Sequence, residues 1–239
     1  MKALKESGME SSNLIIGIDF TGSNLHQGQK SFGGKSLHSL SPYELNPYQR
    51  AIQIIGRTLE FLDEDNIIPC FGFGDIRTKN HSVFPILSST GSWCHGVQDV
   101  LKSYESIVPN VQMSGPTNFA PIINKAIQHL SSGSRREYHI LIILTDGQVT
   151  DSDEEETIKA IVKATNYPLS IITIGVGDGP YDKMEEFDDL LPSRKFDNFQ
   201  FVNYHKVMSQ ADDQDSAFAL AALMEIPDQF REISRLKLL

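Results

Sequence analysis

The segment NLIIGIDFTGSN, residues 13–24, joins a run of aliphatic residues to a cluster of oxygen-bearing side chains. The aliphatic part is too short for a typical helix and is rich in isoleucine, a pattern typical of a strand buried on both faces of a parallel sheet. The cluster consists of Asp19, Thr21 and Ser23, which occupy alternate positions where the strand ends. Two interpretations are open at this point: either Asp19 is a nucleophile, or the three oxygens hold a metal ion.

The composition limits the fold and the partners. A chain of 239 residues with 40% hydrophobic and 22% charged residues is ordinary for a single α/β domain with a sizeable core. The net charge of −10 argues against a nucleic-acid partner. No apolar run approaches the roughly 18 residues that cross a bilayer, so we expect no direct membrane insertion. The two cysteines, Cys70 and Cys94, are too few for a disulfide scaffold, which predicts reduced, buried thiols and a cytoplasmic location.

Strand-like and helical segments alternate along the chain. Apolar runs typical of strands cover residues 14–20, 67–73, 140–144, 169–176 and 199–204, and a short run at 83–87 contains Pro85 and is typical of an edge strand. Apolar residues at three- and four-residue spacing predict helices over residues 47–65, 96–108, 116–132 and 153–165, and a closing helix over residues 216–233.

This alternation predicts an α/β fold with a doubly wound, mainly parallel central sheet flanked by helices, Rossmann-like, and one short antiparallel edge strand. We assign residues 1–12 to an N-terminal lead-in, 13–234 to the domain and 235–239 to a C-terminal tail. In such sheets, ligands bind at the loops that follow the carboxyl ends of the strands.

Polar clusters on three of these loops favour a metal site. Asp19, Thr21 and Ser23 come from the first loop, Thr117 follows Gly-Pro at the head of a predicted helix, and Asp146 ends the strand LIILTDG. Hard divalent cations prefer carboxylate and hydroxyl oxygens such as these. Two carboxylates balance the ion's charge, and one position stays open for a carboxylate of a partner protein.

The nucleophile hypothesis uses the same first loop together with a later glycine-rich segment. Residues 19–23, DFTGS, resemble the D-x-T-G-T motif of haloacid dehalogenase-like phosphohydrolases, and residues 177–182, GDGPYD, have the spacing of their magnesium-binding loop. Thr145, at the end of another strand, would take the place of their phosphate-binding hydroxyl, and Lys159 or Lys163 would neutralise the phosphoaspartate formed on Asp19. However, these enzymes usually carry a second Asp as general acid where this chain has threonine.

The pattern Asp-x-Thr-x-Ser, then a threonine, then Asp-Gly at a strand end resembles the metal-ion-dependent adhesion site (MIDAS) of von Willebrand factor A domains. The match is closer to the copine-type A domain, which the segments DFTGSN, SLH, NPYQRAI, PCFGFGD, GPTNFAPII, ILTDGQVTD and YPLSIITIGVGDG resemble in order, over about residues 10–230. The segments IIGRTLEFLDEDNIIPCFGFGD and FALAALMEIPDQF are most similar to the A domain of the plant-type copine-like RING E3 ubiquitin ligases.

The resemblance implies a von Willebrand A fold that binds Mg²⁺, Ca²⁺ or Mn²⁺ through the five residues named above and recognises a protein partner offering an Asp or Glu carboxylate. It further implies a substrate-recruiting role in a RING-type E3 ubiquitin ligase. A RING needs eight Cys or His zinc ligands, so we expect no catalytic activity from this chain, which has two cysteines. A copine-like adaptor or scaffold without a ligase role is the alternative. Any nuclear or peripheral membrane association of the cytoplasmic protein would arise through partners.

Three further polar residues flank the predicted site. We expect Asn24 and Gln148 to be exposed loop residues that orient ligands or water. Asp75 ends another strand at the same edge of the sheet, where it either contacts the metal ligands or a partner, or caps a turn.

The connection HQGQKSFGGKSLHSLSPYELN, residues 26–46, is long for an α/β loop, and long loops beside a site are often functional. It carries Lys30, Phe32 and Lys35, which we expect to form part of the partner surface. His38 lies in the same polar loop without a partner at metal-binding spacing, so zinc binding is not expected.

Overall fold

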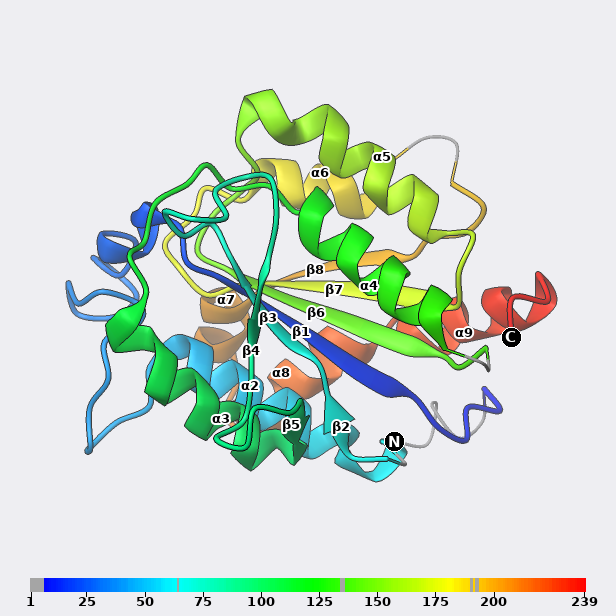
Figure 1. Ribbon diagram of the computed structural model, residues 1–239, viewed down its shortest axis with the longest axis horizontal. Coiled ribbons are helices and arrows are strands. Elements are labelled where there is room, and N and C mark those ends of the chain that lie inside the picture. The colour runs from blue at the N-terminus through cyan, green and yellow to red at the C-terminus, as the bar shows by residue number, and fades with distance from the viewer. Residues whose placement is uncertain (1–6, 64, 134–135, 190, 192–193) are drawn as a thin grey trace.

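The computed structural model describes residues 7–63, 65–133, 136–189, 191 and 194–239, and its centre is a six-stranded sheet in the order β4-β3-β1-β6-β7-β8 (Figure 1). The strands are β1 (Asn13–Asp19), β3 (Cys70–Phe73), β4 (Phe84–Ile86), β6 (His139–Thr145), β7 (Leu169–Gly175) and β8 (Phe199–Asn203). All neighbouring pairs are parallel except β3 and β4, which are antiparallel. The predicted sheet with one antiparallel edge strand is therefore confirmed.

Helices cover both faces of the sheet. Figure 1 shows α4 (Ala120–Ser132), α5 (Glu154–Ala164) and α6 (Asp182–Asp189) above it, and α2 (Pro47–Leu59), α3 (Gly96–Ile107), α7 (Tyr204–Gln210), α8 (Gln214–Leu223) and α9 (Ile226–Arg235) along the other face. A hydrophobic core lies on each face of the sheet, and alternate residues of β1 belong to different cores. Ile16 and Ile18 pack on the side of α2, and Ile15 packs on the side of α4.

The expected strand over residues 67–73 is wrong in one respect, because it is divided in two. β2 (Ile67–Ile68) pairs with β5 (Cys94–His95) in a separate antiparallel two-stranded sheet, and β3 begins only after Pro69. Proline has no N–H to give to a sheet ladder, so the strand changes partners at this residue.

The C-terminal elements also differ from the prediction. The strand expected over residues 199–204 ends at Asn203, whose side chain accepts a hydrogen bond from the backbone N–H of Lys206 and caps α7. The single closing helix is two helices, α8 and α9, and Pro227 lies in the first turn of α9. Proline is tolerated there because the first N–H groups of a helix have no intrahelical acceptor.

The described part of the lead-in packs against the domain. Met9 and Ser12 are buried, and the backbone N–H of Ser12 donates to the Leu62 carbonyl at 2.9 Å. Both cysteines are free and buried, as expected. Among the described residues, no helix is both long and apolar enough to cross a bilayer.

Candidate metal site at the carboxyl edge of the sheet

The two predicted carboxylate ligands come from neighbouring strands. β1 and β6 run parallel with Ile18 opposite Leu144, so Asp19 and Asp146 emerge at the same edge of the sheet. Both are fully buried. In Figure 1 the loops that follow β1 and β6, and the segment leading into α4, gather at this end of the sheet. The topology therefore brings together three segments that are far apart in the sequence.

Asp19 is held by two short hydrogen bonds. The backbone N–H of Thr21 donates to its Oδ1 at 2.7 Å, and the hydroxyl of Thr145 donates to its Oδ2 at 2.6 Å. Burial raises the pKa of Asp19 from its ordinary value and outweighs these hydrogen bonds, which act to lower it. Thr145 is a contact that the sequence did not predict for the metal site. The sequence placed it at the same strand end as Asp146, but only as the phosphate-binding hydroxyl of the phosphohydrolase alternative.

The three predicted hydroxyl ligands surround the same space. Thr21 Oγ1 lies 3.0 Å from Ser23 Oγ, 3.5 Å from Thr117 Oγ1 and 3.5 Å from Asp146 Oδ1. Thr21 and Thr117 are buried, whereas Ser23 is exposed. All five predicted ligands, Asp19 included, therefore meet in one cluster that opens to solvent at Ser23.

Asp146 provides the observation that tests whether a cation fits. Its Oδ2 is buried and receives no hydrogen bond from any of the described residues. Burial and the charge of Asp19 raise the pKa of Asp146 to about 8. A buried carboxylate oxygen without a partner is costly, and a divalent ion placed among these oxygens would remove that cost and balance both charges.

The chemistry of the donors suits a hard cation. Two carboxylates and three hydroxyls are oxygen ligands of the kind that Mg²⁺, Ca²⁺ and Mn²⁺ accept. Within the part of the chain that the structure describes, no three His, Cys, Asp or Glu side chains cluster in the manner of a zinc site. The residues present at this edge therefore fit a divalent cation held largely by neutral oxygens.

Backbone hydrogen bonds keep the three loops in place. The N–H of Ser114 lies 3.1 Å from the Gly74 carbonyl and 3.3 Å from the Phe20 carbonyl. Thr117 and Thr150 bind each other: the N–H of Thr117 donates to the Thr150 hydroxyl at 3.2 Å, and the N–H of Thr150 donates to the Thr117 carbonyl at 3.0 Å. Thr117 is therefore positioned from both sides of the site.

Two glycines allow the close approach of these loops. Gly74 has a φ of +81°, and a Cβ there would lie 2.5 Å from the Thr21 methyl group. A Cβ at Gly177 would lie 2.5 Å from the carbonyl oxygen of Asp146. Any side chain at either position would push a candidate ligand out of place.

His38 lies in the 26–46 loop, as expected, but its side chain is buried beside the site. Its ring stacks between Phe20 and Tyr48, with centroids 4.6 and 4.2 Å away. Nε2 lies 2.8 Å from the Asp19 carbonyl and Nδ1 lies 2.7 Å from the Tyr104 hydroxyl. Burial lowers the pKa of His38 to about 3, so the ring is neutral. Because a carbonyl can only accept, Nε2–H donates to Asp19 and Nδ1 accepts from Tyr104.

The expected exposure of Asn24 is wrong, because this residue is fully buried. Its Nδ2 donates to the Thr21 carbonyl at 3.1 Å, and its Oδ1 accepts from the Tyr48 hydroxyl at 2.6 Å. It therefore orients the first loop through the backbone. Gln148 is partly buried, and its Oε1 accepts from the N–H of Lys183 at 3.3 Å.

Asp75 caps a turn, which is one of its two predicted roles. Its Oδ1 accepts from the backbone N–H of Thr78 at 2.8 Å and from the Thr78 hydroxyl, and its Oδ2 accepts from Arg77 Nε at 3.1 Å. Burial raises the pKa of Asp75, but these hydrogen bonds outweigh it and lower the pKa overall. Both carboxylate oxygens are therefore engaged within the turn.

Of the groups that the phosphohydrolase hypothesis invokes, Thr145 contacts Asp19, whereas Asp178 and the two lysines bind other described residues. The oxygens of Asp178 accept from the backbone N–H groups of Lys30 and Ser31, both at 2.9 Å, so this carboxylate fastens the 26–46 loop. Lys159 pairs with a glutamate of its own helix, and Lys163 binds an asparagine of α4. The recorded polar partners of Asp178, Lys159 and Lys163 therefore do not include Asp19.

The 26–46 loop itself is partly anchored and partly free. Phe32 is half-buried and packs against the core, and Lys35 Nζ lies 5.3 Å above its ring and pairs with Glu44. Lys30 is exposed, and its side chain makes no ion pair with the described residues. The loop thus presents one free cation and one held cation close to the opening of the site.

Comparison with solved structures defines the class of protein. The manganese-loaded Plasmodium vivax TRAP protein superposes with a TM-score of 0.54 at 14% identity, over 88% of this chain and 74% of that one. The VWA domain of SpRpn10 gives a TM-score of 0.52 at 13% identity, over 80% of this chain and 87% of that one. The chain therefore has the von Willebrand A fold, as the sequence resemblance predicted.

Sequence comparison then defines the family. The copine family profile matches residues 36–239, and the chain belongs to the copine family. The E3 ubiquitin-protein ligases RGLG1 and RGLG3 of Arabidopsis thaliana are 52% and 50% identical to it, over 100% and 96% of this chain. Copine family protein 2 of Caenorhabditis elegans is 50% identical over 100% of this chain.

These relatives are longer proteins. The chain spans 51% of RGLG1, 65% of RGLG3 and 3% of Copine family protein 2. The similarity therefore concerns one region of each relative.

Proposed function

We propose that this chain is a protein-recognition domain whose partner binding depends on a divalent cation. The ion is held by Asp19, Thr21, Ser23, Thr117 and Asp146. The observation that carries the proposal is the buried Asp146 Oδ2, which lacks a hydrogen bond from the described residues and lies next to a second buried carboxylate. The manganese-loaded state of TRAP, which has the same fold, supports a divalent cation.

The donor set explains how the ion recognises a partner. Two carboxylates neutralise the ion and hydroxyls add no further charge, so the ion still attracts an additional oxygen ligand. The exposed Ser23 side of the cluster is open to solvent, and an Asp or Glu carboxylate of a partner completes the coordination there. Lys30, Phe32 and Lys35 of the neighbouring loop form the rim that the partner contacts.

The relatives suggest the wider role. RGLG1 and RGLG3 are named E3 ubiquitin-protein ligases, so we propose that this domain recruits proteins for ubiquitination. An adaptor without a ligase role is the second candidate, favoured by the similarity to Copine family protein 2. The cytoplasmic location predicted from the sequence stays a prediction.

Calorimetric titration of Mg²⁺, Ca²⁺ and Mn²⁺ into chelator-treated, dialysed protein tests the site. We expect one ion per chain for the wild type and no binding for Asp146→Asn. Asp75→Asn is the matched control, because Asp75 is also a buried carboxylate at this edge but is engaged by Thr78. Equal binding by wild type and Asp146→Asn would show that the ion, if any, is held elsewhere.

The open position is tested with acetate as a probe carboxylate. Water-proton relaxation of the Mn²⁺-loaded protein should fall when acetate displaces bound water, and Thr117→Ala should weaken this response while the protein remains folded. A scaffold without recognition at this face would show metal binding but no response to acetate.

A phosphohydrolase would hydrolyse an aryl phosphate with Mg²⁺ and lose that activity in Asp19→Asn.

A further inference from the structure

Helix α8 carries apolar side chains on its outer as well as its inner side. Phe218, Ala222 and Leu223 face the core and are buried. On the outer side, Leu220 is 71% exposed, and Met224, one turn later, is 63% exposed. A helix that is apolar all round is normally covered on all sides, so the outer stripe lacks a cover within the described residues.

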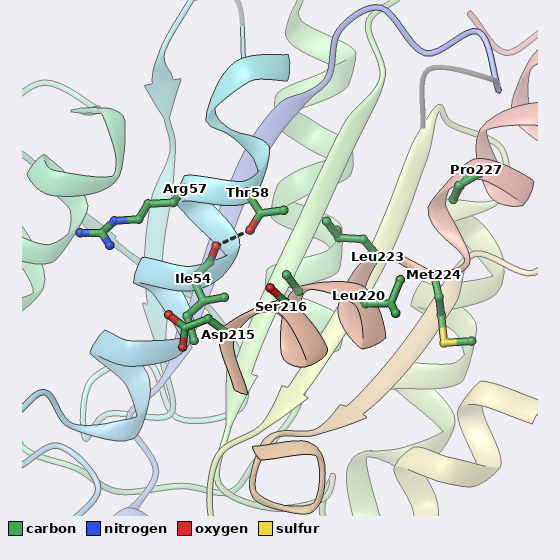
Figure 2. Close-up of a pocket in the computed structure, with 10 residues that line it drawn as sticks. Ile54, Arg57, Thr58, Asp215, Ser216, Leu220, Leu223, Met224 and Pro227 are labelled. Atoms are coloured by element: carbon green, nitrogen blue, oxygen red, sulfur yellow. Dashed lines mark hydrogen bonds between the residues drawn. The ribbon is translucent and has the colours of Figure 1, made fainter. Parts of the chain in front are cut away.

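The stripe borders a hollow between α8 and the C-terminal half of α2. The hollow has a volume of about 510 Å³, and its apolar walls are Ile54, Leu220, Leu223, Met224 and Pro227. Figure 2 shows these side chains strung along the groove, with Met224 and Pro227 at one end and Arg57 at the other. A groove of this size accommodates a few apolar side chains of a ligand.

The polar end of the groove carries an unbalanced positive charge. Asp215 on this rim pairs with Arg50 at 2.6 Å, so its charge is compensated. Arg57 is exposed and has no ion pair with any described residue. In a chain with a net charge of −10, this isolated cation favours an acidic group on whatever occupies the groove.

We infer that the groove between α2 and α8 docks an amphipathic helical segment of a partner protein. The segment has two apolar side chains one turn apart, which pack against Leu220 and Met224, and a carboxylate that reaches Arg57. A helix is the expected form because a third helix can lay its ridge between two neighbouring helices. The groove lies on a helix-covered face, away from the loops of the metal site, so this contact is independent of the cation.

A displayed library of helical peptides of about 16 residues, roughly four turns, is the probe. Peptides selected on the whole chain are measured by fluorescence anisotropy against wild type, Leu220→Asp and Met224→Asp. Both variants should weaken binding by about tenfold or more. They should fold normally, since both side chains are already largely in water. Leu87→Asp is the matched control, because Leu87 is a 40% exposed leucine outside the groove, and it should bind like wild type.

A charge exchange tests the role assigned to Arg57. Arg57→Glu should weaken the selected acidic peptide by about tenfold, and replacing the peptide's acidic residue by lysine should restore binding to that variant only. A chelator should leave the affinity unchanged, which separates this result from the fate of the metal-dependent function.

Two outcomes would overturn the inference. One is that no selected peptide loses affinity for Leu220→Asp. The other is that sedimentation shows a wild-type dimer that Leu220→Asp dissociates, because a second copy of the chain would then cover the stripe.

Discussion

Replacing His38 by phenylalanine tests whether the aromatic stack beside β1 positions the first metal-binding loop. His38→Phe keeps a flat ring between Phe20 and Tyr48 but removes both ring nitrogens. The Asp19 carbonyl then loses a donor at 2.8 Å, and the Tyr104 hydroxyl loses an acceptor at 2.7 Å. Stacking is largely preserved, so the effect reports mainly on the two hydrogen bonds.

Two buried polar groups each lose a partner at a cost of about 1–3 kcal/mol, so the expected loss of unfolding free energy is about 2–6 kcal/mol. We expect a loss near the lower end of that range, because the Asp19 carbonyl and the Tyr104 hydroxyl each keep another hydrogen-bond donor. Asn24 Nδ2 still lies 3.4 Å from the Asp19 carbonyl, and Asn46 Nδ2 still donates to Tyr104 at 3.0 Å. Mg²⁺ affinity should fall about tenfold or more, because groups that orient a ligand typically contribute that much.

Urea unfolding in chelator gives the stability change, and calorimetric Mg²⁺ titration gives the affinity. Tyr104→Phe is the control: it removes the bond to His38 Nδ1 but leaves Nε2–H on the Asp19 carbonyl. It also removes the acceptor of Asn46 Nδ2, which keeps the Ser39 carbonyl at 3.3 Å, so it should cost about 1–3 kcal/mol and leave Mg²⁺ affinity unchanged. If His38→Phe and Tyr104→Phe lowered the affinity equally, or neither did, the proposed positioning of Asp19 by His38 would be wrong.

Three further changes probe the same edge of the sheet. Gly177→Ala puts a Cβ 2.5 Å from the Asp146 carbonyl oxygen, so we expect the unfolding free energy to fall by about 1–3 kcal/mol and Mg²⁺ binding to weaken. Gly147→Ala is the control, because its Cβ would meet no atom within 4 Å, and it should change neither quantity. Equal effects of the two substitutions would contradict the steric argument. Asp178→Asn weakens the hold on the 26–46 loop, and limited proteolysis should cleave that loop faster than in wild type. Partial burial raises the pKa of Asp178, but its hydrogen bonds outweigh this and lower the pKa overall. The protection of the wild-type loop from proteolysis should therefore be complete above about pH 4 and fall as the pH drops below it. The variant should lack this pH-dependent protection. Adding chelator to protein held at a hundredfold excess of Mg²⁺ over Kd should lower the unfolding free energy by about 2.7 kcal/mol; an unchanged denaturation midpoint would argue against the site.

The sequence was sufficient to predict the sheet and the meeting of the candidate ligands. Buried parallel strands leave short aliphatic runs, and the carboxyl ends of such strands share one edge. The order of residues along the chain is therefore enough to bring Asp19 and Asp146 together. Breaks in the elements were harder to predict, because a proline such as Pro69 interrupts a strand without changing the apolar pattern around it.

Only the tertiary structure decided how the site is supported. His38 lies 19 residues from the carbonyl it binds and 66 from Tyr104, and nothing in the local pattern of a polar loop predicts that it is buried. The free stripe on α8 is a similar case, because an all-round apolar helix does not indicate which side meets the sheet. Local periodicity reflects the geometry of the backbone, whereas burial and partner choice depend on how distant segments pack together.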